Sequence, residues 1–489
     1  MDLPIFGTWE SGNRKYLLTV GDLGDSTATL LWLKREGKIA PPVNAPVAKQ
    51  VTIAEKPGDA RKASVKMVFI ASSCNFLEMY DFMVFGYYAP AIARAYFPTT
   101  SQFVSLMLAL ATFGAGFLMR PVGAIVLGGY IDQRGRRLGL LLTLSLMALG
   151  TFSIAAMPTF KTVGIIAPLV VIAGRLLQGL SAGASVGGVS VYLAEISTPG
   201  KEGFYVSWQS ASQQVAVMLA SLVGIGVGFL LPAKSVEQWG WRIPFLLGCL
   251  LIPALFWMQS ALEETPAFLR STRRPGTMEV FKSVAKSWRI ITLGMLLVIL
   301  TTVTFYLITA YTPTFGTAVL NLSFSQTLTA TLCIGLSNFI LLPIMGSLSD
   351  RIGRRPQLIT AAIVAVISGY PTMLWLTSQP SFERLLIAEL WFSLIFTAYN
   401  GAMVVYLTEI MPPEIRTSSF SLAYSLAVGI FGGFTPAICT WLIHLGKNRA
   451  APGIWLSVAA VLSLGAIAML SRRREPIGDA GSSVIAQET

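Results

Sequence analysis

Charged residues are scarce in this sequence of 489 residues. Asp, Glu, Lys and Arg make up only 12% of the chain, whereas 54% of the residues are hydrophobic. An average soluble domain is about 25% charged. A chain with so few charges cannot cover the surface of a soluble protein of this size, so most of it is expected to be solvated by lipid.

Residues that bind metals or form disulfides are also few. The chain has one histidine, His444, and four cysteines, Cys74, Cys249, Cys333 and Cys439, which all fall in apolar segments without metal-ligand spacing. These residues exclude a histidine-based metal centre and a disulfide framework. The sequence contains no Gly-rich phosphate loop and no nucleophile–base pattern, so we expect no enzymatic activity and no cofactor.

Long apolar segments, by contrast, recur about a dozen times between residues 66 and 471, the first of them at 66–94. A helix needs roughly 20 such residues to cross a bilayer, and the alternation of membrane β-strands is absent. We therefore predict an all-α membrane protein with about 12 transmembrane helices. Lys and Arg are more frequent on one side of these helices, which places both termini in the cytoplasm. The net charge of +12 then reflects topology and lipid attraction, and nucleic-acid binding is not expected.

Two motifs occur twice, in the same order and at nearly the same spacing. Residues 132–137 (DQRGRR) match residues 350–355 (DRIGRR), and residues 192–196 (YLAEI) match residues 406–410 (YLTEI). This duplication indicates one six-helix unit repeated twice. The predicted organisation is a disordered cytoplasmic tail, a first half, a cytoplasmic linker, a second half and a C-terminal tail, at residues 1–65, 66–262, 263–288, 289–472 and 473–489.

These motifs resemble those of the major facilitator superfamily. Residues 174–183 (GRLLQGLSAG) and 263–269 (EETPAFL) are similar to two other motifs of that superfamily, and residues 75–98 and 239–245 (WGWRIPF) resemble its metabolite:proton symporter branch. The segments SWQSASQQVA and TFYLITAYTPTFG are similar to bacterial citrate and tricarballylate proton symporters. The resemblance covers roughly residues 66–472.

The resemblance implies proton-coupled uptake of a tricarboxylate, citrate or tricarballylate, across the bacterial inner membrane by alternating access. The expected partners are the tricarboxylate, the proton and membrane lipid, and a monomer is expected. Other interpretations remain open at this point. They are a symporter of a dicarboxylate or of a zwitterion such as betaine or proline, an exporter, and a nutrient sensor that binds without transporting.

Three charged residues fall in the middle of the first two predicted spans. With a helix rise of 1.5 Å per residue, Arg120 and Glu78 both lie about 18 Å from the inner surface, and Asp81 lies one turn farther out. Buried charges in a membrane normally face a cavity or one another. Arg120 cannot deprotonate and suits an anchor for a substrate carboxylate, whereas Glu78 or Asp81 suits proton coupling. A static ion pair between the two helices is the alternative.

Arg175 is a second buried base, which we expect near the outer end of the fourth span and count among the substrate-binding candidates. The repeat places Glu389 at the equivalent position of the second half, so an ion pair across the halves is one interpretation. The resemblance implies a role in proton handling instead, and a helix cap is the third interpretation.

The second half is neutral where the first is charged. The repeat aligns Arg120 with Asn338, and Glu78 and Asp81 with Thr301 and Thr304. We therefore expect the second half to supply polar contacts, although any one of these groups is equally suited to joining helices. The substrate-binding candidates are Arg120, Arg175, Gln209, Gln213, Tyr306, Tyr311, Asn338, Tyr399 and Asn400.

A last group of charged residues lies at the inner helix ends, in and around the repeated motifs. We expect these residues to form a salt-bridge network that closes the inner side. They are Asp132, Arg136, Glu195, Asp350, Arg354 and Glu409.

Overall fold

In the computed structural model, the chain divides into two compact units, residues 1–67 and residues 68–489. The linker predicted at 263–288, apart from its last three residues, and the tail predicted at 473–489 lie outside the described residues. The structure describes residues 5–11, 14–19, 76–134, 136–183, 190–191, 193–194, 197–198, 200–260, 286–412 and 416–472.

The first unit contains two strands, β1 (Ile5–Ser11) and β2 (Arg14–Thr19), which pair antiparallel with Trp9 opposite Tyr16. The disorder predicted for residues 1–65 therefore does not describe these two segments. The reason lies in their composition, because aromatic and β-branched residues favour strands even where no segment is long enough to span a membrane. The rest of the predicted tail lies outside the described residues.

The second unit is helical. Its first helix covers residues 76–87, and a turn at Tyr88 separates it from α3, which has Pro90 in its first turn. Proline fits there because the first amides of a helix have no partner within it. The N-terminal half continues with α3 (Ala89–Tyr96), α4 (Gln102–Arg134), α5 (Arg136–Ala156), α6 (Phe160–Val163), α7 (Ile166–Gly183), α9 (Glu202–Leu230), α10 (Ala233–Ser235), the π-helical η1 (Val236–Gly240) and α11 (Arg242–Ser260).

The C-terminal half contains two long helices that are interrupted by a π-helical turn. One runs through α14 (Trp288–Tyr306), η2 (Leu307–Tyr311) and α15 (Thr312–Ala318), and the other through α19, η4 and α20. The remaining bounds are α16 (Phe324–Ile352), α17 (Arg354–Ser378), α18 (Phe382–Ile410), α19 (Arg416–Ala427), η4 (Val428–Gly432), α20 (Thr435–Gly446) and α21 (Ala451–Arg472).

The described helices fit the predicted architecture of 12 transmembrane helices in two repeats. Nine of them are long and apolar enough to cross a membrane, and two shorter apolar stretches, Leu141–Ala156 and Arg242–Pro253, lie in α5 and α11. Residues 76–87 belong to the first predicted span, which together with these eleven accounts for twelve. The prediction of the fold class is confirmed, and the orientation of the termini stays a prediction.

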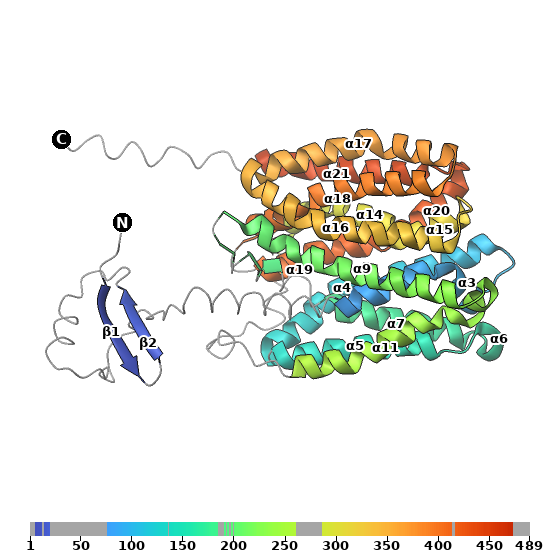
Figure 1. The fold of residues 1–489 in the computed structure, drawn as a ribbon, viewed down its shortest axis with the longest axis horizontal. Coiled ribbons are helices and arrows are strands. Elements are labelled where there is room, and N and C mark those ends of the chain that lie inside the picture. Colours follow the sequence, from blue (N-terminus) through green and yellow to red (C-terminus); the bar gives the residue numbers. More distant parts are fainter. Residues whose placement is uncertain are drawn as a thin grey trace. The chain divides into compact units, whose positions relative to one another are not determined.

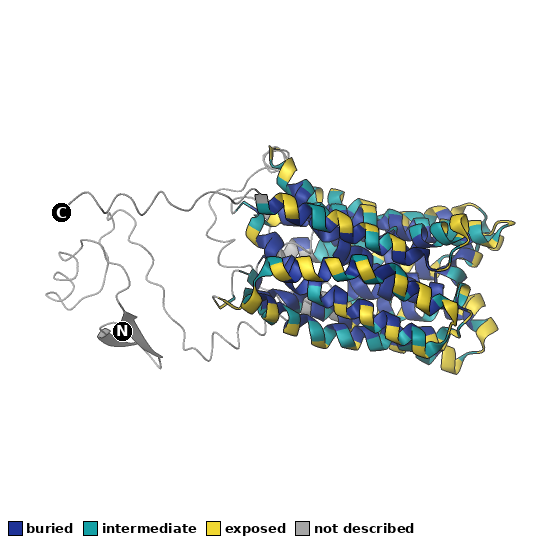
Figure 2. Ribbon diagram, turned by 90° about the horizontal axis from the view of Figure 1, so that it is seen from above, coloured by how far each residue is buried: buried dark blue, intermediate teal, exposed yellow. Residues whose placement is uncertain are grey.

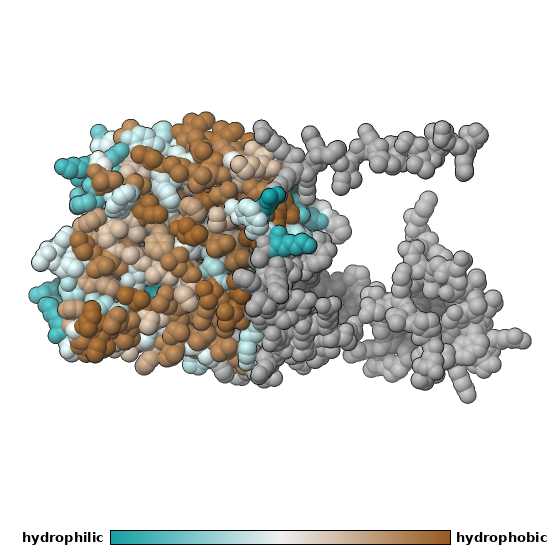
Figure 3. All heavy atoms as spheres, turned by 180° about the vertical axis from the view of Figure 1, so that it is seen from behind, coloured by the Kyte–Doolittle hydropathy of each residue, from teal (hydrophilic) through white to brown (hydrophobic). Residues whose placement is uncertain are grey.

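The two halves pack by the same scheme. In the N-terminal half, α7 packs on α4 and α5, and α11 packs on α5; in the C-terminal half, α18 packs on α16 and α17, and α21 packs on α17. Figure 1 shows the two groups side by side, with α9 along α16. Buried residues face the interior of the bundle (Figure 2), and apolar side chains cover much of the lateral surface seen in Figure 3. Such a surface suits a protein surrounded by lipid.

Small residues allow the closest helix contacts. A Cβ added to Gly179 would lie 1.6 Å from the carbonyl oxygen of Gly116, and one added to Gly183 would lie 2.0 Å from that of Arg120, so α4 and α7 touch backbone to backbone. This contact fixes the position of Arg120 on α4. The two halves meet along α9 and α16 and along α4 and the broken helix α19–η4–α20.

Candidate functional site

A small cavity lined by residues of both halves lies between them. Helices 76–87, α4 and α9 of the first half and helices α14, α18, α19 and η4 of the second half contribute to its wall. The lining residues are Met79, Arg120, Ser210, Gln213, Thr301, Thr302, Phe305, Tyr306, Phe396, Asn400, Tyr424 and Val428.

Arg120 is the one charged residue among these lining residues. It projects from the middle of α4, just before Pro121, and only 2% of it is exposed. Its Nη2 atom is 2.5 Å from Oε1 of Glu78, which is also buried. The Nε atom of Arg120 has no hydrogen-bond partner among the described residues. The guanidinium thus combines one strong ion pair with a buried donor that has no partner among the described residues.

A second ion pair lies one turn farther along the first helix. Nη1 of Arg175 is 3.3 Å from Oδ2 of Asp81 and 2.8 Å from Oε1 of Gln178, and the Gln178 amide donates to Thr151 at 3.0 Å. Arg175 is completely buried and lies nine residues after α7 begins at Ile166, so it lies deeper than the helix end predicted for it. The prediction measured the depth of Arg175 only from the inner end of the span.

The two acids of the first helix therefore have different partners, Glu78 with Arg120 and Asp81 with Arg175. An aromatic ring separates the two pairs, because Phe82 lies 5.0 Å from the Arg120 guanidinium and 4.5 Å from that of Arg175. Such contacts stabilise buried cations. The ion pair across the halves between Arg175 and Glu389 is not present, since Glu389 is hydrogen-bonded to Thr312 instead.

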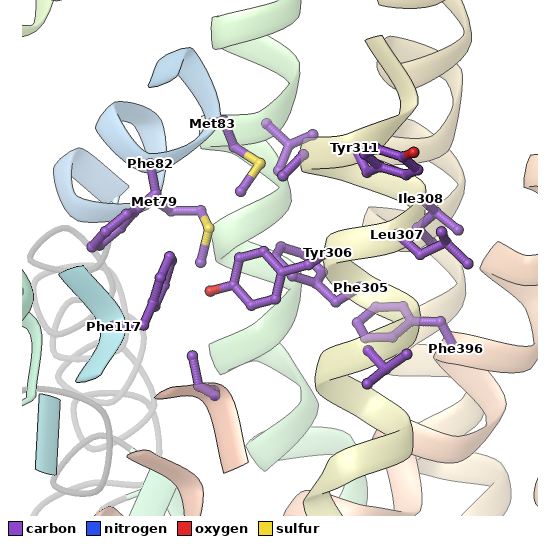
Figure 4. Close-up of a cluster of buried hydrophobic side chains, with 14 of the residues drawn as sticks. Met79, Phe82, Met83, Phe117, Phe305, Tyr306, Leu307, Ile308, Tyr311 and Phe396 are labelled. Carbon is purple, nitrogen blue, oxygen red and sulfur yellow. The ribbon is translucent and has the colours of Figure 1, made fainter. Parts of the chain in front are cut away.

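An aromatic cluster connects the two halves beside the cavity. Tyr306 of α14 lies 5.1 Å from Phe117 of α4, ring centre to ring centre, and 5.1 Å from Phe305. Figure 4 shows the Tyr306 ring directed from its helix toward Phe117 and Met79. Tyr306 thereby presents a hydroxyl group from the second half to the charged region of the first.

Four of the nine predicted substrate-binding residues line the cavity together: Arg120, Gln213, Tyr306 and Asn400. Neither the Nδ2 nor the Oδ1 atom of Asn400 has a partner among the described residues. Buried amides normally have partners. Asn400 is therefore the neutral residue of this group that is best placed to contact a ligand.

The other five predicted residues lie outside the cavity lining, Arg175 among them. Asn338 donates to Gln214 at 3.2 Å and accepts from Ser393 at 2.7 Å, so it joins α16 to α9 and α18. The hydroxyl of Tyr399 donates to the Leu297 carbonyl at 2.8 Å. Two more have polar partners close by, since Gln209 accepts from Ser210 and Tyr311 accepts from Thr440.

Sequence reasoning missed several lining residues. Ser210 belongs to the polar stripe between residues 207 and 214 that contains Gln213, and Thr302 is next to Thr301, so both had a signal in the sequence. Tyr424 and Val428 had none, because the sequence does not reveal that α19 and η4 face α4.

The predicted inner network is present in its C-terminal part. Arg354 is bonded to Asp350, and its Nε atom lies 3.3 Å from Oε1 of Glu409. It also reaches Glu202 of α9, in the other half, at 3.4 Å. The side chains of the other three predicted members, at positions 132, 136 and 195, lie outside the described residues.

Asp350 strengthens this contact between the halves. Its two carboxylate oxygens accept from the amides of Gly203 and Phe204 at 2.8 and 3.0 Å. These amides belong to the first turn of α9, where the helix dipole favours a negative charge. The network therefore connects the motif of the second half to the N-terminus of α9 in the first half.

Two six-helix halves around a central cavity with buried ion pairs define a secondary transporter of the two-repeat type. Residues 323–485 match the family described as Major Facilitator Superfamily, and residues 67–282 match that described as Sugar (and other) transporter. The chain belongs to the major facilitator superfamily.

Two relatives are similar over nearly their whole length. A citrate-proton symporter of Salmonella typhi is 55% identical, with 85% of this chain and 95% of the relative covered, and one of Klebsiella pneumoniae is 51% identical, with 88% and 95% covered. The fold is similar to that of the xylose transporter XylE from E. coli in a partially occluded inward open conformation. The TM-score is 0.67 at 18% identity, with 85% of this chain and 98% of that chain covered.

Proposed function

We propose that this protein takes up citrate together with protons across the bacterial inner membrane, as its two halves rock around the central cavity. The identity of more than half to citrate-proton symporters supports the substrate. The observation that carries the mechanism is Arg120, a buried cation on the cavity wall whose partner, Glu78, can bind a proton.

Glu78 and a citrate carboxylate compete for the same guanidinium. When Glu78 is ionised, it neutralises Arg120 at 2.5 Å, and a second carboxylate gains little there. When Glu78 binds a proton, Arg120 loses its counter-ion and attracts the substrate carboxylate. Proton binding and citrate binding then favour each other, which is the coupling that symport needs.

The pair of Asp81 and Arg175 is the second candidate for the coupling proton. It lies farther along the same helix, outside the cavity lining, so its effect on citrate would be transmitted through the Phe82 side chain between the two pairs.

The remaining groups of citrate meet neutral polar side chains. The wall of the cavity offers the hydroxyls of Ser210, Thr301 and Tyr306 and the amides of Gln213 and Asn400. Arg120 therefore binds one carboxylate with charge-assisted hydrogen bonds, and the other carboxyl groups receive ordinary hydrogen bonds. We assign no enzymatic step to the protein. We expect it to act as a monomer in lipid, without nucleic acid.

Uptake of labelled citrate into vesicles that contain the purified protein tests this proposal. An inward proton gradient should drive accumulation above the external concentration, and collapsing the gradient should abolish the accumulation. Binding of citrate without uptake or exchange would favour the sensor interpretation instead.

A zwitterion such as betaine or proline is the second candidate substrate. The cavity has the aromatic side chains Phe305, Tyr306, Phe396 and Tyr424, which suit a quaternary ammonium group, beside an arginine that suits its carboxylate. Unlabelled betaine in excess should leave citrate uptake unchanged if citrate is the substrate. Strong inhibition by betaine would support the second candidate.

A further inference from the structure

Glu389 is a buried carboxyl group that this mechanism does not use. It lies on α18 and is 6% exposed. Its Oε1 atom is 2.8 Å from Oγ1 of Thr312, and its Oε2 atom has no hydrogen-bond partner among the described residues. None of the ion pairs found within the described ranges involves Glu389. An ionised carboxylate in this environment is strongly unfavourable, because burial removes its hydration without supplying a counter-ion.

The hydrogen bonds of Thr312 indicate which atom carries the proton. The Thr312 hydroxyl lies 2.9 Å from the carbonyl oxygen of Ile308, 3.3 Å from that of Leu307 and 2.8 Å from Glu389. A hydroxyl has one proton to donate, and carbonyls and carboxylates only accept. If Glu389 were ionised, three acceptors would share one proton. If Glu389 is protonated, it donates to Thr312, and Thr312 donates to the Ile308 carbonyl.

The charged residues of the helices that pack against α18 are confined to the first or last turn of each helix. On α18 itself, Glu383 and Arg384 lie in the first turn, six and five residues before Glu389, and Glu409 lies in the last turn. The nearest titratable neighbour in sequence to Thr312 is Tyr311, whose hydroxyl accepts from Thr440 at 3.2 Å. The charged residues of the packed helices are Glu202, Arg289, Asp350, Arg351, Arg354, Arg355 and Arg416.

The segment bonded to Glu389 touches the first helix of the chain. Thr312 follows η2, a π-helical interruption of the kind that often accompanies functional sites. A Cβ added to Gly86 would lie 3.1 Å from the Cβ and carbonyl oxygen of Ala310 in η2. Residues 76–87 also carry Glu78 and Asp81, so movement of η2 acts on the helix that holds both acids.

We propose that Glu389 is a further proton-binding residue of the transport cycle, in the half that otherwise lacks one. Its protonated carboxyl donates to Thr312 and holds the junction of η2 and α15 against α18, where η2 also contacts the first helix. Loss of the proton leaves a charge that needs water, which favours movement of this segment away from α18. This inference rests on the proposed proton-coupled transport.

Citrate exchange at equal pH on both sides of the vesicle membrane tests the inference, because no gradient then drives transport. The rate is measured over a range of pH for the wild type, Glu389→Gln, Thr312→Val and the matched control Thr312→Ser. Citrate itself titrates over such a range, but this contribution is the same for all four proteins.

Glu389→Gln and Thr312→Val are expected to change the exchange rate in opposite directions. Titration of Glu78 and of citrate affects all four proteins alike, so each variant is compared with the wild type at the same pH. Glu389→Gln cannot ionise, so its rate should match the wild-type rate at the acid end and fall below it at the alkaline end, where the wild type releases the segment. Thr312→Val removes the acceptor of the carboxyl proton, so its rate should exceed the wild-type rate at the acid end and match it at the alkaline end. Thr312→Ser keeps the hydroxyl and should retain the wild-type profile.

A Glu389→Gln profile that superimposes on that of an active wild type would overturn the inference, because Glu389 would then stay protonated throughout. An inserted but inactive Glu389→Gln combined with a wild-type profile for Thr312→Val would overturn it as well, since the carboxyl would serve only folding. Absence of citrate exchange by the wild type would instead contradict the proposed function.

Discussion

The N-terminal half buries two arginines and two acids in the middle of its helices, whereas the C-terminal half has neutral residues at most of the equivalent positions. Asn338 stands in the place of Arg120, and both ends of its amide have hydrogen-bond partners. Thr304 stands in the place of Asp81 and donates to a carbonyl of its own helix at 2.7 Å. The same packing scheme thus supports an ionic centre in one half and a hydrogen-bonded helix contact in the other.

This difference shows that the repeat determines where a polar side chain projects, and the residue type determines what it does there. A buried charge must have a counter-ion or a ligand, so it creates a site that can respond to protons and anions. A buried amide or hydroxyl can be satisfied by its neighbours and then only joins helices. Glu389, in the place of Arg175, is the exception in the second half.

The largest effect is expected from Arg120→Lys, which keeps the charge of the first half but removes the planar guanidinium. Losing a charge-assisted hydrogen bond costs about 1.5–3 kcal/mol. Citrate affinity should therefore fall about 10- to 100-fold. The measurement is initial uptake against citrate concentration, with membrane insertion checked in parallel.

Arg94→Lys is the matched control for this variant. Arg94 forms an ion pair with Glu237 at 3.2 Å in which both side chains are 55% exposed, so the replacement should leave uptake unchanged. Wild-type affinity in Arg120→Lys would contradict the role of Arg120 as the carboxylate anchor.

The next effect separates the two acids of the first helix. Glu78→Gln cannot release a proton, so it should lose accumulation driven by a pH gradient but retain exchange of internal for external citrate. The same pair of measurements applies to Asp81→Asn. The acid whose variant loses accumulation alone is the coupling site.

Asp81→Asn needs a control because it leaves Arg175 buried without a counter-ion, at a cost of about 3–5 kcal/mol. The double variant Asp81→Asn/Arg175→Gln removes both charges and tests whether any loss comes from the orphaned cation. Loss of accumulation and exchange in both single variants would favour static ion pairs, and full accumulation in both would exclude these acids as coupling sites.

Much of this comparison could be predicted from the sequence. The repeated motifs gave the two halves, and the helix rise placed Glu78 and Arg120 at the same depth, where the structure has them 2.5 Å apart. The motif residues Asp350, Arg354 and Glu409 were expected to interact, and they do. Linear spacing is sufficient in these cases because the partners lie on adjacent helices or in the same motif.

The other features of the site depend on how each helix is rotated about its axis, and a single sequence does not specify that rotation. In the sequence, Asp81 and Glu389 are both candidate ion-pair partners of Arg175. Only the packing of α7 within the first half selects Asp81. Asn338 and Asn400 look alike in the sequence, but one has neighbours on both sides and the other faces the cavity.

A smaller effect follows from this contrast between the two asparagines. Asn338→Leu removes the hydrogen bonds that join α16 to Gln214 and Ser393 and should reduce stability by about 1 kcal/mol, while the citrate affinity of the folded protein stays the same. Asn400→Leu should weaken citrate binding without lowering the thermal midpoint, because its amide has no partner among the described residues. Thermal unfolding in detergent and citrate titration of both variants measure the two quantities. The reverse pattern would show that the cavity lining does not identify the ligand contacts.

The smallest effect, none at all, is expected from deletion of residues 1–60. The charged and neutral halves are both contained in the second unit, which begins at Val68, and none of the cavity residues precedes Met79. If the difference between the halves is a property of these helices alone, the truncated protein should accumulate citrate at the wild-type rate per inserted molecule. Replacing Arg120 by lysine in the truncated protein should then reduce the affinity by the same factor as in the full chain. Uptake and surface labelling of all four proteins provide both numbers. A truncated protein that inserts normally but no longer accumulates citrate would show that the first 60 residues, including the β1–β2 hairpin, take part in transport.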